Sequence, residues 1–149
     1  MTTQKNTQST DKQFPPTFRF FNYKVYQESK NWYQEVSHLK GILEDNTDLW
    51  YQVKSNMTSL VMNIAAASTK LPDEAKRYLG NSITAANKAM ACLDIACDLK
   101  VITNEELEAL SEGFKGIIIQ LKGFIKVLGK PSQRSNKPAK NEQLTLTKQ

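Results

Sequence analysis

Apolar side chains recur every three or four residues in four stretches of this chain, and this spacing constrains the fold more than any other feature. It follows the 3.6-residue turn of an α-helix, so each stretch predicts a helix with one buried face. The first stretch covers about residues 23–43, with Val25, Ser29, Trp32, Val36, Leu39 and Leu43 on the predicted seam.

The other three stretches carry equally regular seams. The second, about residues 48–68, has Trp50, Val53, Met57, Leu60, Ile64 and Ala67. The third, about residues 72–99, has Ala75, Leu79, Ser82, Ala86, Ala89, Leu93, Ala96 and Leu99, and its alanines predict a thin helix. The fourth, about residues 103–129, has Leu107, Leu110, Phe114, Ile117, Leu121, Phe124 and Leu128.

Residues that start helices lie between the seams. Asn46 or Thr47 is placed to cap the second helix. Pro72 suits the first turn of the third helix, because the N–H that it lacks would have no helical partner there. Thr103 and Glu106 have the spacing of a capping box, in which each side chain accepts a hydrogen bond from the other residue's backbone N–H.

Four amphipathic helices joined by short turns predict an all-α fold, an antiparallel up-down-up-down four-helix bundle. The bundle is expected to span residues 18–129. Residues 1–17 are polar, and residues 130–149 are basic and rich in Ser, Asn, Gln and Pro. Both segments are therefore predicted to be flexible, the first as a leader and the second as a basic tail.

Charge is sorted along the predicted bundle, although residues 18–129 hold as many basic as acidic side chains and the net charge of +5 belongs to the two tails. Acids gather around the first and third turns: Glu44, Asp45, Asp48, Asp94, Asp98, Glu105, Glu106, Glu108 and Glu112. The opposite end collects Arg19, Lys24, Lys30, Lys70, Lys76, Arg77, Lys122 and Lys126. A cationic end on a neutral body indicates an anionic partner.

The sequence shows no secretory or membrane-spanning pattern. The first residues lack an apolar core of the signal-peptide kind, and no window reaches the roughly 18 uninterrupted apolar residues of a membrane span. Cys92 and Cys97 lie five apart on one predicted helix and point in different directions, so they cannot form a disulfide. We expect a cytoplasmic protein without a membrane partner.

Candidates for catalysis are few. His38 lies on the polar side of the first helix, where a lone histidine is usually a surface residue. A di-metal bundle would need Glu-x-x-His pairs that face inward, and the sequence offers none: its one Glu-x-x-His, from Glu35 to His38, lies on the polar side of the first helix. We therefore expect a protein that is not an enzyme, with no catalytic residue, metal ligand or cofactor.

Aromatic residues lie beside the predicted cationic end. Phe18, Phe20, Phe21 and Tyr23 flank Arg19 and Lys24 in the sequence. They could stack on unpaired bases or close the open end of the bundle, because phenylalanine is readily buried. The sequence leaves both roles open.

Short motifs in the first three stretches carry a resemblance to a known family. Val25-Tyr26-Gln27-Glu28-Ser29-Lys30 resembles its V-(Y/W)-Q-(K/E)-(A/S)-(K/R) start, and Gln52-Val53-Lys54 its Q-(L/I)-R. Ser59-Leu60 with Asn63-Ile64-Ala65 resembles S-I-P-S-N-I-A-E-G, Arg77-Tyr78-Leu79 resembles R-F-L, and Leu93-Asp94-Ile95-Ala96 resembles L-E-I-A. This order resembles the bacterial four-helix-bundle family of 23S rRNA intervening-sequence proteins and Avd, the accessory variability determinant of diversity-generating retroelements. Differences at Val61, Ala66, Ala67 and Asn87 favour the Avd-like branch.

The resemblance implies a homopentameric ring with a basic surface. In the Avd branch it implies binding to a reverse transcriptase and its template RNA or cDNA. The residues expected to contact phosphate are Lys24, Lys30, Lys54, Lys76, Arg77, Lys122, Lys126, Lys130, Arg134, Lys137 and Lys140. The alternative is a protein-interaction scaffold of the intervening-sequence type that does not contact nucleic acid.

Overall fold

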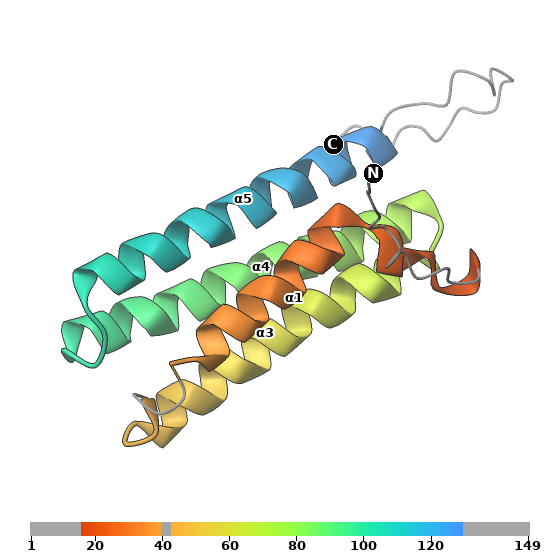
Figure 1. Ribbon diagram of the computed structural model, residues 1–149. Coiled ribbons are helices and arrows are strands. Elements are labelled where there is room, and N and C mark those ends of the chain that lie inside the picture. The colour runs from red at the N-terminus through yellow and green to blue at the C-terminus, as the bar shows by residue number, and fades with distance from the viewer. Residues whose placement is uncertain (1–15, 40–42, 130–149) are drawn as a thin grey trace, which may run out of the picture.

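The described part of the chain consists of helices joined by short connections. A computed structural model describes residues 16–39 and 43–129 (Figure 1). Four long helices follow a short 3-10 helix: η2 (Pro16–Asn22), α1 (Lys24–Ser37), α3 (Thr47–Ala67), α4 (Pro72–Asp98) and α5 (Asn104–Gly129). The described residues contain no β-strand, which confirms the all-α prediction. The predicted boundary between leader and bundle at residues 17 and 18 falls inside η2.

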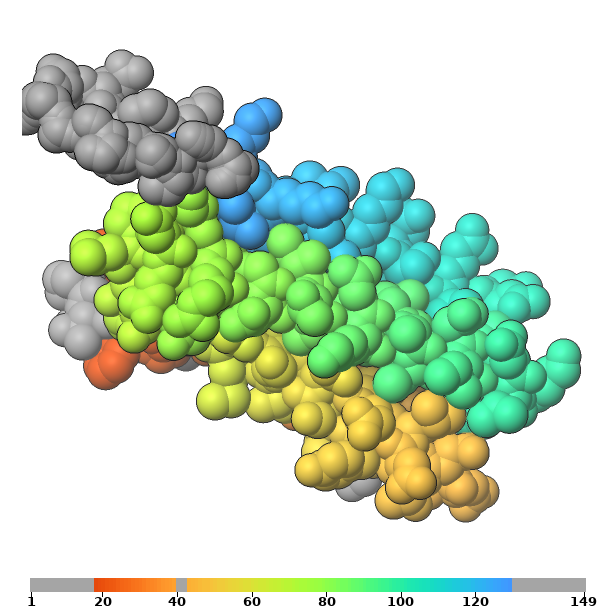
Figure 2. All heavy atoms as spheres, turned by 180° about the vertical axis from the view of Figure 1, so that it is seen from behind, coloured from red at the N-terminus to blue at the C-terminus, as the bar shows by residue number. Residues whose placement is uncertain are grey.

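Each long helix packs against two of the others. α3 and α5 both contact α1 and α4, and Figure 2 shows α4 lying between α3 and α5. In Figure 1 the α3–α4 connection lies at the opposite end from the α4–α5 connection. We call these the turn-70 end and the turn-100 end. α1 begins and α5 finishes at the turn-70 end.

The predicted seams form the hydrophobic core. The largest fully buried side chains include Phe114, Met57, Leu60, Leu79 and Ile117. Trp32, Trp50, Leu107, Phe124 and Leu128 are half-buried against that core.

The prediction for Leu99 is wrong, because its side chain is 56% exposed. α4 finishes at Asp98, and Lys100 then takes a left-handed backbone conformation with φ of 66°. This turn leaves Leu99 outside the core, and Ile102 is buried instead, at 3% exposure.

α1 is shorter than the spacing predicts. It finishes at Ser37, where the next backbone bond tightens and the Leu39 N–H donates to the Val36 carbonyl three residues earlier, at 2.9 Å. Leu39 and Leu43 are nevertheless buried, so the buried face that the spacing predicts continues beyond the end of α1.

Small side chains bring α3 and α4 together. Ala85, Ala86 and Ala89 on α4 are all buried. The buried Ser82 hydroxyl donates a hydrogen bond to the Leu60 carbonyl of α3 at 2.8 Å. A serine hydroxyl can reach a neighbouring main chain only across a short gap, so α4 is thin on the side that faces α3.

The capping predictions have mixed outcomes. The Thr103 N–H donates to Glu106 Oε1 at 2.8 Å and the Glu106 N–H donates to Thr103 Oγ1 at 3.0 Å, which confirms the capping box. Pro72 lies in the first turn of α4 as predicted. The side-chain cap predicted for α3 is wrong: Asn46 precedes the helix without a side-chain cap bond, and the Thr47 hydroxyl donates backwards to the Glu44 carbonyl at 3.2 Å.

The hydropathy of the helices bears on membranes. No helix in residues 16–39 and 43–129 is both long enough and apolar enough to cross a bilayer.

Candidate nucleic-acid interface

Seven of the predicted phosphate-contacting residues lie in the described part of the chain. They are Lys24 and Lys30 on α1, Lys54 on α3, Lys76 and Arg77 on α4, and Lys122 and Lys126 on α5. The other four, Lys130, Arg134, Lys137 and Lys140, lie outside the described residues.

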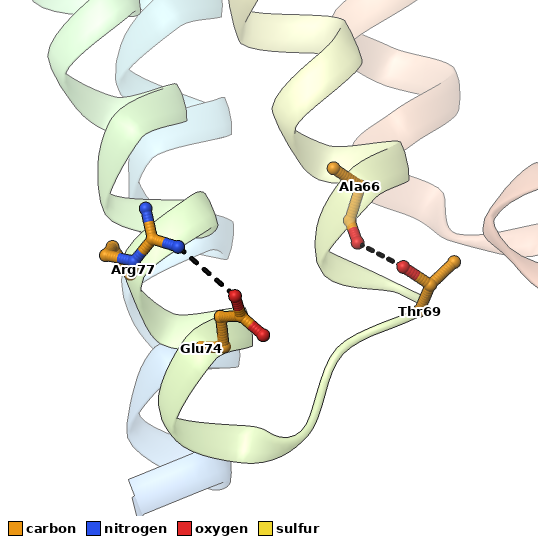
Figure 3. Close-up of polar contacts among 4 residues, drawn as sticks. All are labelled: Ala66, Thr69, Glu74 and Arg77. Atoms are coloured by element: carbon orange, nitrogen blue, oxygen red, sulfur yellow. Dashed lines mark hydrogen bonds and ion pairs between the residues drawn. The ribbon is translucent and has the colours of Figure 1, made fainter.

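The two basic residues at the start of α4 are paired with acids of the same turn. Lys76 Nζ lies 3.6 Å from Asp73 Oδ1. Arg77 Nη2 lies 3.3 Å from Glu74 Oε2, the pair drawn in Figure 3. The Lys76 side chain is only 19% exposed. Its Nζ lies 3.8 Å from the position that a Cβ on Gly129 would occupy, so it covers the end of α5. Lys76 is therefore poorly placed to meet a large anion.

Two basic side chains, one in the α3–α4 turn and one at the start of α4, lie over the same aromatic ring. Lys70 Nζ lies 5.5 Å and the Arg77 guanidinium carbon 4.8 Å from the centre of the Tyr78 ring. The Thr69 hydroxyl donates to the Ala66 carbonyl at 2.9 Å and finishes α3 (Figure 3). These contacts fix the turn, and they engage both cations within the protein.

The basic residues of α1 are also engaged, though more loosely. Lys24 Nζ lies 3.8 Å from Glu28 Oε2, and the Lys24 side chain is 78% exposed. Lys30 Nζ lies 5.0 Å from the centre of the Tyr26 ring. Exposed ion pairs of this kind contribute little stability, about 0–1 kcal/mol, so Lys24 can exchange its partner at small cost.

The α5 helix carries unpaired lysines in a line. Lys115, Lys122 and Lys126 are exposed and form no ion pair with any residue of the described ranges. Steps of seven and four residues place them within about 40° of one another around the helix. We call these three residues the lysine ridge. The sequence prediction missed Lys115, although its seven-residue spacing from Lys122 could have revealed it.

Lys54 does not join the ridge. It is exposed and unpaired among the described residues, but it lies in the half of α3 nearer the turn-100 end. The exposed Lys88 of α4 is likewise unpaired within this part of the chain. It lines a shallow polar groove of about 230 Å³ with Asn56, Asn63, Asn81 and Thr84.

An apolar groove runs beside the ridge, between the start of α1 and the last turns of α5. Its volume is about 420 Å³, and it is lined by Tyr23, Lys24, Val25, Gln120, Gly123, Phe124 and Val127. We call it the α1–α5 groove. The Tyr23 and Phe124 rings meet edge to face at 5.4 Å. A Cβ on Gly123 would meet no atom within 4 Å, so the groove is open at this position.

The aromatic residues before α1 pack mainly on one another. The Phe20 and Phe21 rings are stacked at 4.7 Å, and Phe20 meets Tyr26 of α1 edge to face at 5.0 Å. Phe18 lies against both phenylalanines and is 48% exposed. This geometry favours the packing role over base stacking for Phe20 and Phe21.

The groups that could support catalysis or hold a metal are dispersed. In residues 16–39 and 43–129 no three His, Cys, Asp or Glu side chains lie close enough together to hold a metal ion. His38 is exposed, as predicted. Cys92 and Cys97 are free thiols, as predicted; burial raises the pKa of the Cys92 thiol, and the Cys97 thiol donates to Asn104 Oδ1 at 3.0 Å.

No protein-family model matches the chain, and neither the curated proteins nor the solved structures give a significant match.

Proposed function

We propose that this chain is a non-enzymatic nucleic-acid-binding accessory protein, and that the lysine ridge on α5 is its main phosphate-contacting surface. The observation that carries the proposal is the alignment of Lys115, Lys122 and Lys126, all exposed and unpaired within the described residues. Lys24 at the edge of the α1–α5 groove extends the same surface.

The spacing of the ridge suits a polyanion. At 1.5 Å per residue, the three lysines are separated along the helix by about 10 Å and 6 Å. A nucleic-acid backbone presents several phosphates over that length, and each neutralised phosphate releases counterions. A small acidic ligand would occupy only one lysine, so the line favours an extended partner.

The wider assembly in our proposal follows the resemblance to the Avd branch. The protein would act in the cytoplasm as a homo-oligomer, a pentameric ring, that binds a reverse transcriptase and its template RNA or cDNA. Its helices would run in antiparallel up-down-up-down order. A ring would repeat the three-lysine surface around its rim, and repeated weak contacts raise overall affinity.

Two double variants with equal charge loss test the proposal. Lys122→Gln/Lys126→Gln removes two ridge lysines, and Lys54→Gln/Lys88→Gln removes two exposed, unpaired lysines from the other helices. We expect the ridge variant to bind RNA about tenfold more weakly and to lower the salt slope by about 1.4, since each phosphate contact on a single strand contributes about 0.7. The control variant should change both quantities little. Equal losses in the two variants would contradict a localised interface.

A protein-interaction scaffold remains the second candidate. Tyr51, Ile95 and Leu99 are exposed by 62%, 48% and 56%. Tyr51 and Ile95 lie in the halves of α3 and α4 nearer the turn-100 end, and Leu99 directly follows α4. Exposed apolar side chains at an acidic end fit a protein partner better than a nucleic acid. If a Tyr51→Ser/Leu99→Ser variant loses its cellular partners while the ridge variant keeps them, this candidate is the better one.

A further inference from the structure

We propose that the α1–α5 groove receives an unpaired nucleobase, so that the ligand of this protein is single-stranded nucleic acid. This inference rests on the proposed function and deepens it, because it assigns a strand type to the same surface. Neither the lysines nor their spacing distinguishes a single strand from a duplex.

The groove has the chemistry of a base-stacking site. Val25, Phe124 and Val127 give it apolar walls, and Tyr23 adds an aromatic ring. Val127 is 66% exposed, so an apolar surface beside the groove is open to solvent. Bases stack on aromatic and apolar surfaces regardless of their sequence, because every base has a π-face.

The groove is kept open by a glycine. Gly123 lines it, and a Cβ at that position would meet nothing within 4 Å, so a side chain there would project into free space. Gly116, two turns earlier on α5, is equally uncrowded but does not line the groove. Both glycines could therefore accept a side chain without a clash, but only a side chain at Gly123 would enter the groove.

The lysines around the α1–α5 groove indicate that its ligand carries negative charge. Lys24 lines the groove from α1. Lys122 and Lys126 each precede a groove-lining residue, Gly123 and Val127, and successive residues lie 100° apart on a helix, so both lysines face solvent at the groove's edge. An apolar hollow bordered by cations fits a base with its attached phosphates.

Few polar groups near the groove are available to distinguish one nucleobase from another. Among the described residues Gln120 is the one amide that lines it, and its Nε2 donates to Glu28 Oε1 at 2.5 Å. Its amide is therefore engaged between α5 and α1. In a duplex the bases are paired and stacked, so only a strand with an unpaired base can enter. We infer a preference for single strands with weak dependence on sequence.

Filling the groove tests the inference. In fluorescence anisotropy with labelled 12-nucleotide RNA, single-stranded and duplex, Gly123→Leu should weaken single-strand binding about tenfold and leave duplex binding unchanged. Gly116→Leu is the matched control and should change neither. Val127→Gln, at an exposed position, is a second groove variant should Gly123→Leu fold poorly. An abasic single strand should bind the unaltered protein as weakly as the intact strand binds Gly123→Leu.

The two proposals can fail separately. If Gly123→Leu and Val127→Gln bind single strands like the unaltered protein while Lys122→Gln/Lys126→Gln loses affinity, the groove inference is wrong and the ridge stands. If the ridge variant loses nothing, the proposed function itself fails. A change of oligomeric state in light scattering with unaltered RNA binding would identify the groove as an interface between copies, and would also overturn the inference.

Discussion

The indole of Trp32 on α1 occupies the space that a side chain on Gly113 of α5 would need. A Cβ at that glycine would overlap the six-membered ring of the indole, which also stacks on Phe114 at 6.2 Å. The glycine thus sets how closely α1 and α5 approach in the middle of the bundle.

The first prediction concerns this contact. We expect Gly113→Ala to lower the free energy of unfolding by about 1–3 kcal/mol, the usual range for overpacking a core. Gly116→Ala is the matched control, because a Cβ there meets nothing within 4 Å. It should raise stability by about 0.5–1 kcal/mol through helix propensity. Urea unfolding followed by circular dichroism measures both, and equal effects would show that Trp32 moves aside freely.

The second prediction concerns the end of α4. The Val101 N–H donates to the Ala96 carbonyl and the Lys100 N–H to the Cys97 carbonyl, both at 2.9 Å, which is the Schellman pattern. Lys100 fills the left-handed position that usually holds glycine. We expect Lys100→Gly to raise the free energy of unfolding by about 0.5–1 kcal/mol. Lys100→Gln, which removes the charge and keeps a Cβ, should leave stability nearly unchanged.

The third prediction compares two buried serines. Ser82 donates to the Leu60 carbonyl, whereas the Ser29 hydroxyl has no hydrogen-bond partner in the described residues, and both are 0% exposed. Ser82→Ala should destabilise the protein by about 1 kcal/mol, while Ser29→Ala should stabilise it by a similar amount, because it removes an unpaired buried hydroxyl. Thermal unfolding of both variants would show opposite shifts. A loss at Ser29 would mean that its hydroxyl finds a partner in solution.

The fourth prediction concerns the reactivity of Cys92. Burial raises the pKa of this thiol, so a smaller fraction is thiolate at a given pH than for an exposed cysteine. In a Cys97→Ser variant, a thiol-specific disulfide reagent should label Cys92 more slowly at pH 8 in the folded than in the unfolded protein. The folded-state rate should keep rising above about pH 8.5, the ordinary thiol pKa. A plateau below that pH would contradict the raised pKa.

The sequence was sufficient for the helices and for most of their buried faces, since periodic spacing acts over many residues. Val53, Ile64 and Leu121 are buried where the spacing predicts them. Leu99 was not predictable in the same way, because the pattern continues past the residue at which a left-handed backbone turns the chain. A single φ angle at Lys100 decides its exposure.

The candidate interface was less predictable than the fold. The sequence shows that Arg77 and Lys76 are basic, but their partners Glu74 and Asp73 depend on side-chain conformation. The α1–α5 groove joins residues about a hundred positions apart, and no local pattern connects Tyr23 with Gly123. Spacing on one helix can predict a line of lysines, whereas a hollow between two helices depends on their packing.

The alanines that line α4 also bear on how this protein can change over time. Ala85, Ala86 and Ala89 are buried on α4, so a larger side chain at any of these positions would have to displace its packed neighbours. The outward face of α5 is under no such restriction, because Lys115, Ile119 and Lys122 extend into solvent. Packing should therefore make divergence among descendants of this sequence slower at these buried positions of α4 than at the exposed positions of α5.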